Sequence, residues 1–119
     1  MGRLLNSSLT LLIFLTGIYS CKSPKSITEN CQTKKIKFEM PKVGQLVDYE
    51  FCIPDNETVW KELMLINPSL KRTASKGRSN CGKGKVLVLG NTDNKDYKIM
   101  LCKIANLDYV KEVNQTFWE

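Results

Sequence analysis

Apolar and polar positions are most clearly organised between Cys81 and Cys102. Val86 to Leu89 is a run of β-branched and aliphatic residues that ends at Gly90, which predicts a strand. The polar stretch from Asn91 to Asp96 is typical of a turn. We expect Tyr97 to Leu101 to form a second strand that pairs back onto the first as a hairpin.

The end of the chain has the periodicity of a helix. Four apolar residues recur there at intervals of three or four: Leu107, Val110, Val113 and Phe117. This spacing places them on one face of a helix, which we expect over Leu107 to Trp118. Asn106 is of a type that caps helix starts, so it would begin this element.

The first half of the chain is less decisive. Ile36 to Met40 alternates apolar and charged residues and predicts a short strand, and Leu46 to Ile53 predicts another that includes Cys52. Thr58 to Ile66 fits a helix capped by Asn56. The continuous apolar run at the end of that segment fits the start of a strand equally well, so both interpretations stay open.

The N-terminus has the pattern of an export signal. Arg3 is followed by an apolar run from Leu9 to Ile18, and Ser20 offers a cleavage point. The run is too short to span a bilayer stably, and no other stretch is comparable, so we expect no stable membrane span. We expect a signal peptide at 1–20, a flexible polar arm at 21–33 and a single secreted domain at 34–119. The alternative is a bacterial lipoprotein that is lipidated on Cys21.

All five cysteines follow the predicted signal: Cys21, Cys31, Cys52, Cys81 and Cys102. Export favours disulfides over metal binding or redox chemistry, and two bridges would staple a small domain. The chain has no histidine and no Cys-x-x-Cys pair, so no metal site is expected. The last four cysteines are the candidate disulfide residues. Cys21 is left over, and it would be lipidated, paired between chains or free.

The sequence offers no catalytic constellation. Without histidine there is no histidine general base or Ser-His-Asp triad. Gly82 to Lys85 superficially suggests a phosphate loop, but it lacks the Walker spacing and precedes a strand where a helix should follow. We therefore expect no enzyme and no cofactor.

Basic residues gather on either side of Cys81. The formal net charge is +6, and cleavage of the signal removes Arg3 and no acid, which leaves about +5. Acidic residues are absent from Lys71 to Leu89. The candidate contact residues are Lys71, Arg72, Lys76, Arg78, Lys83 and Lys85. Such a run binds polyanions such as sulfated glycans, or it is only a solvated loop, and both remain open. Nucleic acid is not expected as a partner, because the chain is exported and no aromatic residues interleave with these charges.

Two sequons are candidate glycosylation sites. They are Asn56-Glu-Thr and Asn114-Gln-Thr. A glycan on Asn114 would have to lie on the exposed face of the expected terminal helix.

The segment from Cys52 to Glu119 resembles the body of the chemokine family. Cys81 and Cys102 match the third and fourth family cysteines, and Tyr109 to Val113 resembles the aromatic-valine start of the family helix. The adjacent first pair of cysteines in that family has no counterpart here. The resemblance covers just over half of the chain and rests mainly on layout.

This resemblance implies a small α+β domain, with a three-stranded antiparallel sheet and a C-terminal helix. Its first strand would lie within Lys61 to Leu70. The family's pairing order would join Cys31 to Cys81 and Cys52 to Cys102. It also implies a cytokine-like ligand or effector that acts on a cell-surface receptor and contacts glycosaminoglycans. The alternatives are a secreted inhibitor or toxin-like effector that blocks a target protein, and the lipid-anchored bacterial protein.

Overall fold

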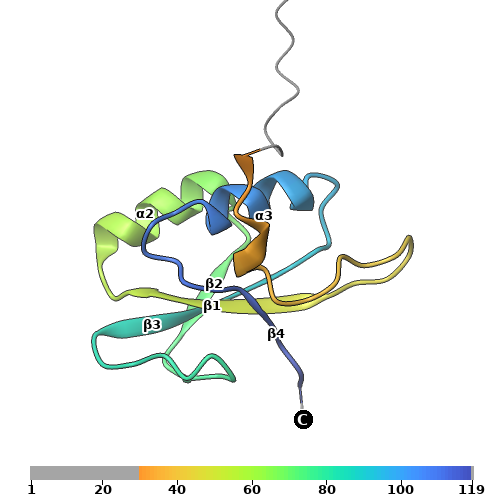
Figure 1. Ribbon diagram of the computed structural model, residues 1–119. Coiled ribbons are helices and arrows are strands. Elements are labelled where there is room, and N and C mark those ends of the chain that lie inside the picture. The colour runs from red at the N-terminus through yellow and green to blue at the C-terminus, as the bar shows by residue number, and fades with distance from the viewer. Residues whose placement is uncertain (1–29, 119) are drawn as a thin grey trace, which may run out of the picture.

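Within residues 30–118, the chain folds as four strands and two α-helices. The computed structural model describes residues 30–118 of the 119. The helices α2 (Glu57–Ile66) and α3 (Tyr97–Ala105) lie together on one face of an antiparallel sheet (Figure 1). A short 3-10 helix, η3 (Thr33–Lys35), comes before the first strand. The α+β class is confirmed. The expected signal peptide, Cys21 and residues 22–29 of the expected arm lie outside the described residues.

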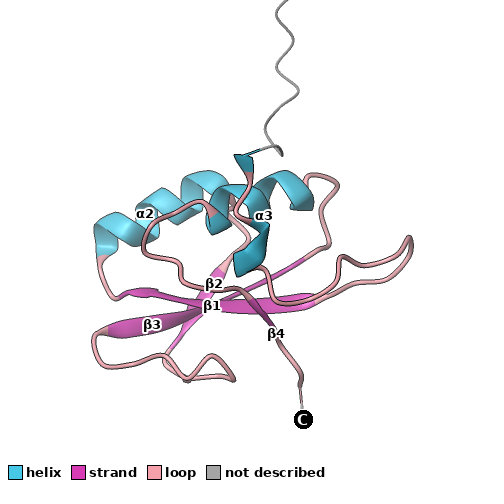
Figure 2. Ribbon diagram, in the orientation of Figure 1, coloured by secondary structure: helices cyan, strands magenta, loops and turns pink. Residues whose placement is uncertain are grey.

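The sheet has the strand order β2-β3-β1-β4. The central strands β1 (Asp48–Pro54) and β3 (Lys85–Asn91) pair along their whole length. The edges are β2 (Lys71–Thr73), which pairs with β3, and β4 (Asn114–Gln115), which pairs with β1. Figure 2 shows the strands as one layer beneath the helices. With the two helices, this order is the split βαβ arrangement, and the sheet has four strands where three were expected.

Alternation along β1 explains the two faces of the sheet. Tyr49, Phe51 and Ile53 are fully buried and belong to the main core, where they join residues of the helices such as Leu63 and Leu101. The residues between them point to the opposite face, because side chains alternate along a strand. The predicted strand at Leu46 to Ile53 is therefore confirmed, with its start shifted to Asp48.

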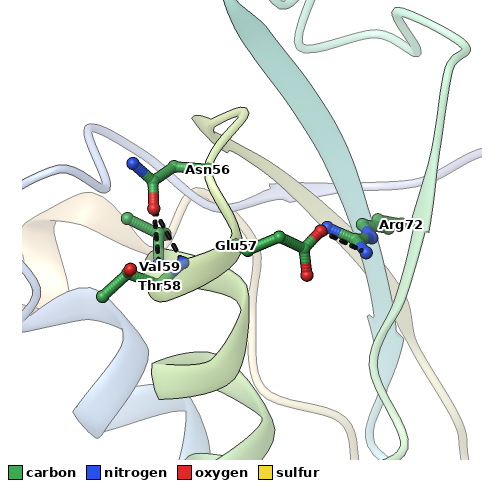
Figure 3. A network of polar contacts seen from close by, with 5 residues as sticks. All are labelled: Asn56, Glu57, Thr58, Val59 and Arg72. Carbon is green, nitrogen blue, oxygen red and sulfur yellow. Dashed lines mark hydrogen bonds and ion pairs between the residues drawn. The ribbon is translucent and has the colours of Figure 1, made fainter.

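The open question at Thr58 to Ile66 is resolved as a helix. The Asn56 side-chain oxygen accepts hydrogen bonds from the N–H groups of Thr58 at 2.7 Å and Val59 at 3.2 Å (Figure 3). This satisfies two of the N–H groups that a helix start leaves unpaired. The cap on Asn56 was predicted from the sequence. The strand that the chemokine resemblance placed in Lys61 to Leu70 is wrong, because the helix occupies most of that range.

The predicted hairpin is wrong in its second half. Val86 to Leu89 does lie in a strand, but Tyr97 to Leu101 belongs to α3. Three residues of that helix are buried at helical spacing: Leu101, Ile104 and Ala105. The apolar run at the start of α3 is so short that its spacing fits the repeat of a helix and that of a strand equally well. The central strand β3 pairs instead with β1 and β2.

The predicted terminal helix over Leu107 to Trp118 is also wrong. Val110 and Val113 are fully buried, as their spacing suggested, but Val110 lies in irregular chain and Val113 forms an isolated β-bridge. Val113 N–H donates to the Lys35 carbonyl at 2.7 Å, and Lys37 N–H donates to the Val113 carbonyl at 2.8 Å. These bonds to a distant segment replace the bonds that a helix would make. Of the strand expected at Ile36 to Met40, only a bridge between Ile36 and Val113 forms.

The pairing of cysteines differs from the one that the resemblance implied. Cys52 is bonded to Cys81, with their Cα atoms 5.5 Å apart, so the expected bridges Cys31–Cys81 and Cys52–Cys102 are wrong. The register of β1 explains this, because Cys52 points to the face away from the helices. Cys102 lies in α3, on the other side of the sheet. No helix within residues 30–118 is both long and apolar enough to cross a membrane.

Candidate functional site

The loop from 74 to 84 covers the face of the sheet that the helices leave open (Figure 1). It connects the edge strand β2 to the central strand β3. The Cys52–Cys81 disulfide ties the end of this loop to β1. Most of the predicted basic residues lie in this loop or beside it, so its position decides what they can contact.

A buried carboxylate holds the middle of the loop. Glu50 of β1 is 1% exposed, and its Oε2 accepts hydrogen bonds from Ser79 N–H at 2.7 Å and from Ser79 Oγ at 2.8 Å. Its Oε1 accepts one from Thr116 Oγ1 at 3.0 Å. The charge is thus compensated by three donors, which is what burial of a carboxylate requires. Glu50 joins the sheet, the loop and the C-terminal segment.

A glycine lets the loop approach the sheet. Gly77 has φ +59°, a left-handed conformation that glycine adopts without steric penalty. A Cβ at this position would lie 2.6 Å from Leu87 Cδ2 and 2.7 Å from Glu50 Oε2. No larger residue fits here without displacing its neighbours, so the loop lies close to the sheet because residue 77 has no side chain.

Three of the predicted basic residues gather around one hollow beside the disulfide. Lys76, Lys83 and Lys85 line this hollow of about 480 Å³, which we call the lysine hollow. All three are exposed, and the lining contains no acidic residue. Within residues 30–118, no carboxylate forms an ion pair with any of them. Their positive charge therefore remains available to an anion from solvent.

The two arginines are engaged within the protein. Arg72 lies 2.8 Å from Glu57 in an ion pair (Figure 3), and its guanidinium lies 4.7 Å from the ring centre of Trp60. Arg78 lies 5.0 Å from the ring centre of Phe117. Both geometries are typical of cation–π contacts. These arginines therefore brace the edge of the sheet and the C-terminal segment, and they contribute less than the lysines to an anion site.

Lys71 is separated from the lysine hollow. It lines another hollow, of about 230 Å³, together with Asp48 and Trp118. Alternation along β2 places Lys71 on the open face of the sheet and Arg72 on the helix side. The six predicted contact residues thus form one group of three lysines and three separately placed residues.

The sequence did not point to a second cavity, of about 600 Å³, on the open face of the sheet. Its floor includes Leu87 and Leu89, and Arg78, Phe117 and Trp118 form part of its wall. Phe117 is 54% exposed and Trp118 68%, and Trp118 Nε1 donates to Asp48 Oδ2 at 2.8 Å. The predicted terminal helix had assigned Phe117 to a buried face. The sequence feature that could have indicated this cavity is the pair of adjacent aromatic residues, Phe117 and Trp118.

The two candidate glycosylation sites lie in different surroundings. Asn56 is exposed and uses only its carbonyl oxygen to cap α2, so its amide nitrogen can carry a glycan. Asn114 is half-buried in β4, and its Nδ2 donates to Ser79 Oγ at 3.1 Å and to Glu112 Oε1 at 3.2 Å. The exposed helix face on which this glycan was expected to lie does not form.

Comparison with known proteins identifies no relative. No family model matches the chain, and no curated protein or solved structure is significantly similar to it. Within residues 30–118, acidic and cysteine side chains form no group that could hold a metal ion. The lysine hollow and the cavity beside Phe117 are the candidate binding features of the described residues.

Proposed function

We propose that this is a secreted extracellular binding protein that holds sulfated glycans through the lysine hollow. It would act as a cytokine-like ligand or effector on a cell-surface receptor. The observation that carries the proposal is the hollow itself, where Lys76, Lys83 and Lys85 converge without a neighbouring carboxylate in the lining. An anion bound there would meet three positive charges at once, and the attraction would be screened by salt.

The framework of the hollow supports the same function. The Cys52–Cys81 bridge and the Glu50–Ser79 hydrogen bonds fix the loop that carries Lys76. A fixed loop loses less conformational freedom when it binds, so more of the electrostatic attraction appears as affinity. Lysine offers a compact charge on a flexible stem, which suits sulfate groups whose spacing varies along a glycan.

The protein partner would dock beside the cavity that Phe117 and Trp118 border. Exposed aromatic residues next to an arginine are the residue types that contribute most at protein interfaces. This cavity and the lysine hollow both adjoin the 74–84 loop, since Ser75 lines each of them. A receptor and a sulfated glycan would therefore engage neighbouring parts of one face.

Heparin chromatography tests the glycan site. The variant K76Q/K83Q/K85Q removes the charge of the hollow, and K42Q/K61Q/K103Q removes the same charge from exposed lysines elsewhere. We expect the first variant to elute at clearly lower salt, and its slope of log affinity against log salt to fall by about two to three, as for other polyanion contacts. We expect the control to elute close to the unmodified protein.

Equal shifts in both variants would mean that binding follows net charge alone, which would reject the site. An unchanged elution of K76Q/K83Q/K85Q would reject it as well. Circular dichroism of all three proteins checks that the fold is retained. The receptor is tested separately, by cell binding of F117A/W118A with and without competing heparin.

A further inference from the structure

A strap formed by residues 31–37 runs across the C-terminal end of α3 and the segment that follows. Gln32 N–H donates to Asn106 Oδ1 at 2.9 Å, and Lys35 Nζ donates to the Leu107 carbonyl at 3.1 Å. Near the end of the strap, Ile36 forms a β-bridge with Val113. Residues far apart in sequence are thereby held side by side, and Cys31 is the residue directly before Gln32.

Cys102 lies one helical turn before Asn106, since Asn106 N–H donates to the Cys102 carbonyl at 3.0 Å. Its side chain is 2% exposed, and a hydrogen bond joins it to the side chain of Cys31. Burial, together with a smaller effect of the neighbouring Cys31 thiol in the same direction, raises the pKa of the Cys102 thiol to about 12. The two thiols are thus neighbours; Cys31 is half-exposed and Cys102 is buried.

We propose that Cys31 and Cys102 are a second disulfide site, which locks the strap to α3 when the protein reaches an oxidising compartment. The proposal does not depend on the function of the lysine hollow, because the strap lies on the helix side of the molecule. It differs from the pairing that the chemokine resemblance implied. It is independent of Cys21, which lies outside the described residues.

The chemistry needs an oxidant, and a low-molecular-weight disulfide such as oxidised glutathione supplies it. The Cys31 thiolate attacks one sulfur of that disulfide, forms a mixed disulfide and releases one thiolate. Cys102 then gives its proton to solvent, attacks the Cys31 sulfur and releases the second thiolate. Two protein thiols are oxidised and one small disulfide is reduced to two thiols. Because Cys31 is the more exposed of the pair, it is the sulfur that meets the oxidant first.

In sequence, the proposed Cys31–Cys102 bridge would enclose the Cys52–Cys81 bridge. Cys52 and Cys81 both lie between Cys31 and Cys102 in sequence, so the two bridges are nested. The outer bridge closes a long loop, which restricts the unfolded chain strongly. It would fix the strap, the C-terminal end of α3 and the 107–113 segment as one unit.

Peptide mapping without reductant tests the proposal. The full-length protein is folded in a glutathione redox buffer, denatured with N-ethylmaleimide present and digested with trypsin. Lysine residues lie between each pair of successive cysteines in the domain, so each of the four falls on its own peptide. We expect the Cys31 peptide to be linked to the Cys102 peptide, and the Cys52 peptide to the Cys81 peptide. The same links are expected in Cys21→Ser.

Two results would overturn the proposal. One is full alkylation of Cys31 by N-ethylmaleimide, and the other is a link from Cys31 or Cys102 to Cys21. Thermal unfolding of Cys31→Ser gives a second measurement. We expect its Tm to fall by about 10 °C or more in oxidising buffer, as for loss of a disulfide in a small domain. An unchanged Tm would likewise reject the crosslink.

Discussion

Glu50 and Ser79 form the hydrogen-bonded pair that joins the central strand to the loop over it. One carboxylate oxygen of Glu50 accepts both the N–H and the hydroxyl of Ser79, at 2.7 Å and 2.8 Å. Glu50 is a charged residue on a face of the sheet that would be open to solvent if the loop were absent. The loop helps to bury the carboxylate and supplies two of its three donors, and Thr116 in the C-terminal segment supplies the third. The stability of the loop therefore depends on the hydrogen bonds that Glu50 accepts.

Removal of this carboxylate should loosen the loop and lower stability. Glu50→Ala leaves three donors without their acceptor in a buried place, so we expect the free energy of unfolding to fall by about 2–4 kcal/mol. The measurement is urea unfolding followed by circular dichroism. Glu39→Ala, which changes an exposed carboxylate, is the matched control and should change little. Equal stability of the two variants would contradict a structural role for Glu50.

Gly77 and Gly82 lie five residues apart and should respond differently to alanine. At Gly77 the new Cβ meets Leu87 at 2.6 Å, and φ is +59°. We expect Gly77→Ala to lower the free energy of unfolding by about 2–4 kcal/mol, because strain and overlap add. At Gly82 a Cβ meets nothing within 4 Å, so Gly82→Ala should change it by less than about 1 kcal/mol.

The same urea experiment compares the two glycine variants. Limited proteolysis adds a local measurement, since the loop contains Lys76 and Arg78 as trypsin sites. Faster cleavage is expected in Gly77→Ala alone. Similar stabilities for the two alanine variants would show that the loop does not lie against the sheet as described.

Asn56 should carry a glycan when the chain passes through a eukaryotic secretory pathway, and Asn114 should remain largely unmodified in the folded protein. The amide nitrogen of Asn56 is exposed, whereas that of Asn114 donates two hydrogen bonds. Mass spectrometry before and after treatment with a peptide N-glycosidase measures this. Thr58→Ala removes the first sequon but leaves Asn56 as the cap, and it should abolish the mass shift.

The cap and the glycan can be separated by a second pair of variants. Asn56→Asp keeps an oxygen for capping, whereas Asn56→Ala removes it, and both lack the glycan. In unglycosylated protein, we expect Asn56→Ala to be about 1 kcal/mol less stable and Asn56→Asp to be nearly unchanged. A persistent mass shift in Thr58→Ala would place the glycan on Asn114 instead.

Stability should fall in alkali as tyrosines ionise. Burial raises the pKa of Tyr109, as does its hydrogen bond to Glu62 Oε1 at 2.6 Å. Burial raises the pKa of Tyr49 to about 12, against a smaller lowering by Asn67. In the unfolded chain both tyrosines lose their protons near pH 10, before the folded protein does. The contribution of the two tyrosines to folding stability is thus complete below about pH 10. It is lost as the pH rises through their pKa values in the folded protein.

Urea midpoints between pH 9 and pH 11.5 measure this loss. Tyr109→Phe cannot ionise at this position, so we expect its midpoint to fall less steeply with pH than that of the unmodified protein. Glu62→Gln keeps an acceptor oxygen but removes the charge, and its slope should lie between the two. Identical slopes in all three proteins would contradict the assignment of Tyr109.

Part of the candidate site could be predicted from composition, and part could not. The absence of acids from Lys71 to Leu89 was enough to point to this region as basic. The sequence could not show that Lys76 is available to an anion whereas Arg72 is engaged within the protein. Arg72 contacts Glu57 and Trp60 only because α2 packs beside β2. The anchoring role of Glu50 was equally hidden, since Ser79 is 29 residues away.

The sequence by itself determined the features that neighbouring residues decide among themselves. Val86 to Leu89 is a strand because β-branched and aliphatic side chains favour extended backbone, and Asn56 caps α2 through bonds to residues two and three positions on. Only the tertiary structure decided that Val113 lies beside the strap and that Cys52 meets Cys81. Such contacts depend on which face of the sheet a residue occupies and on what covers that face, and neither is encoded within a few residues of the site.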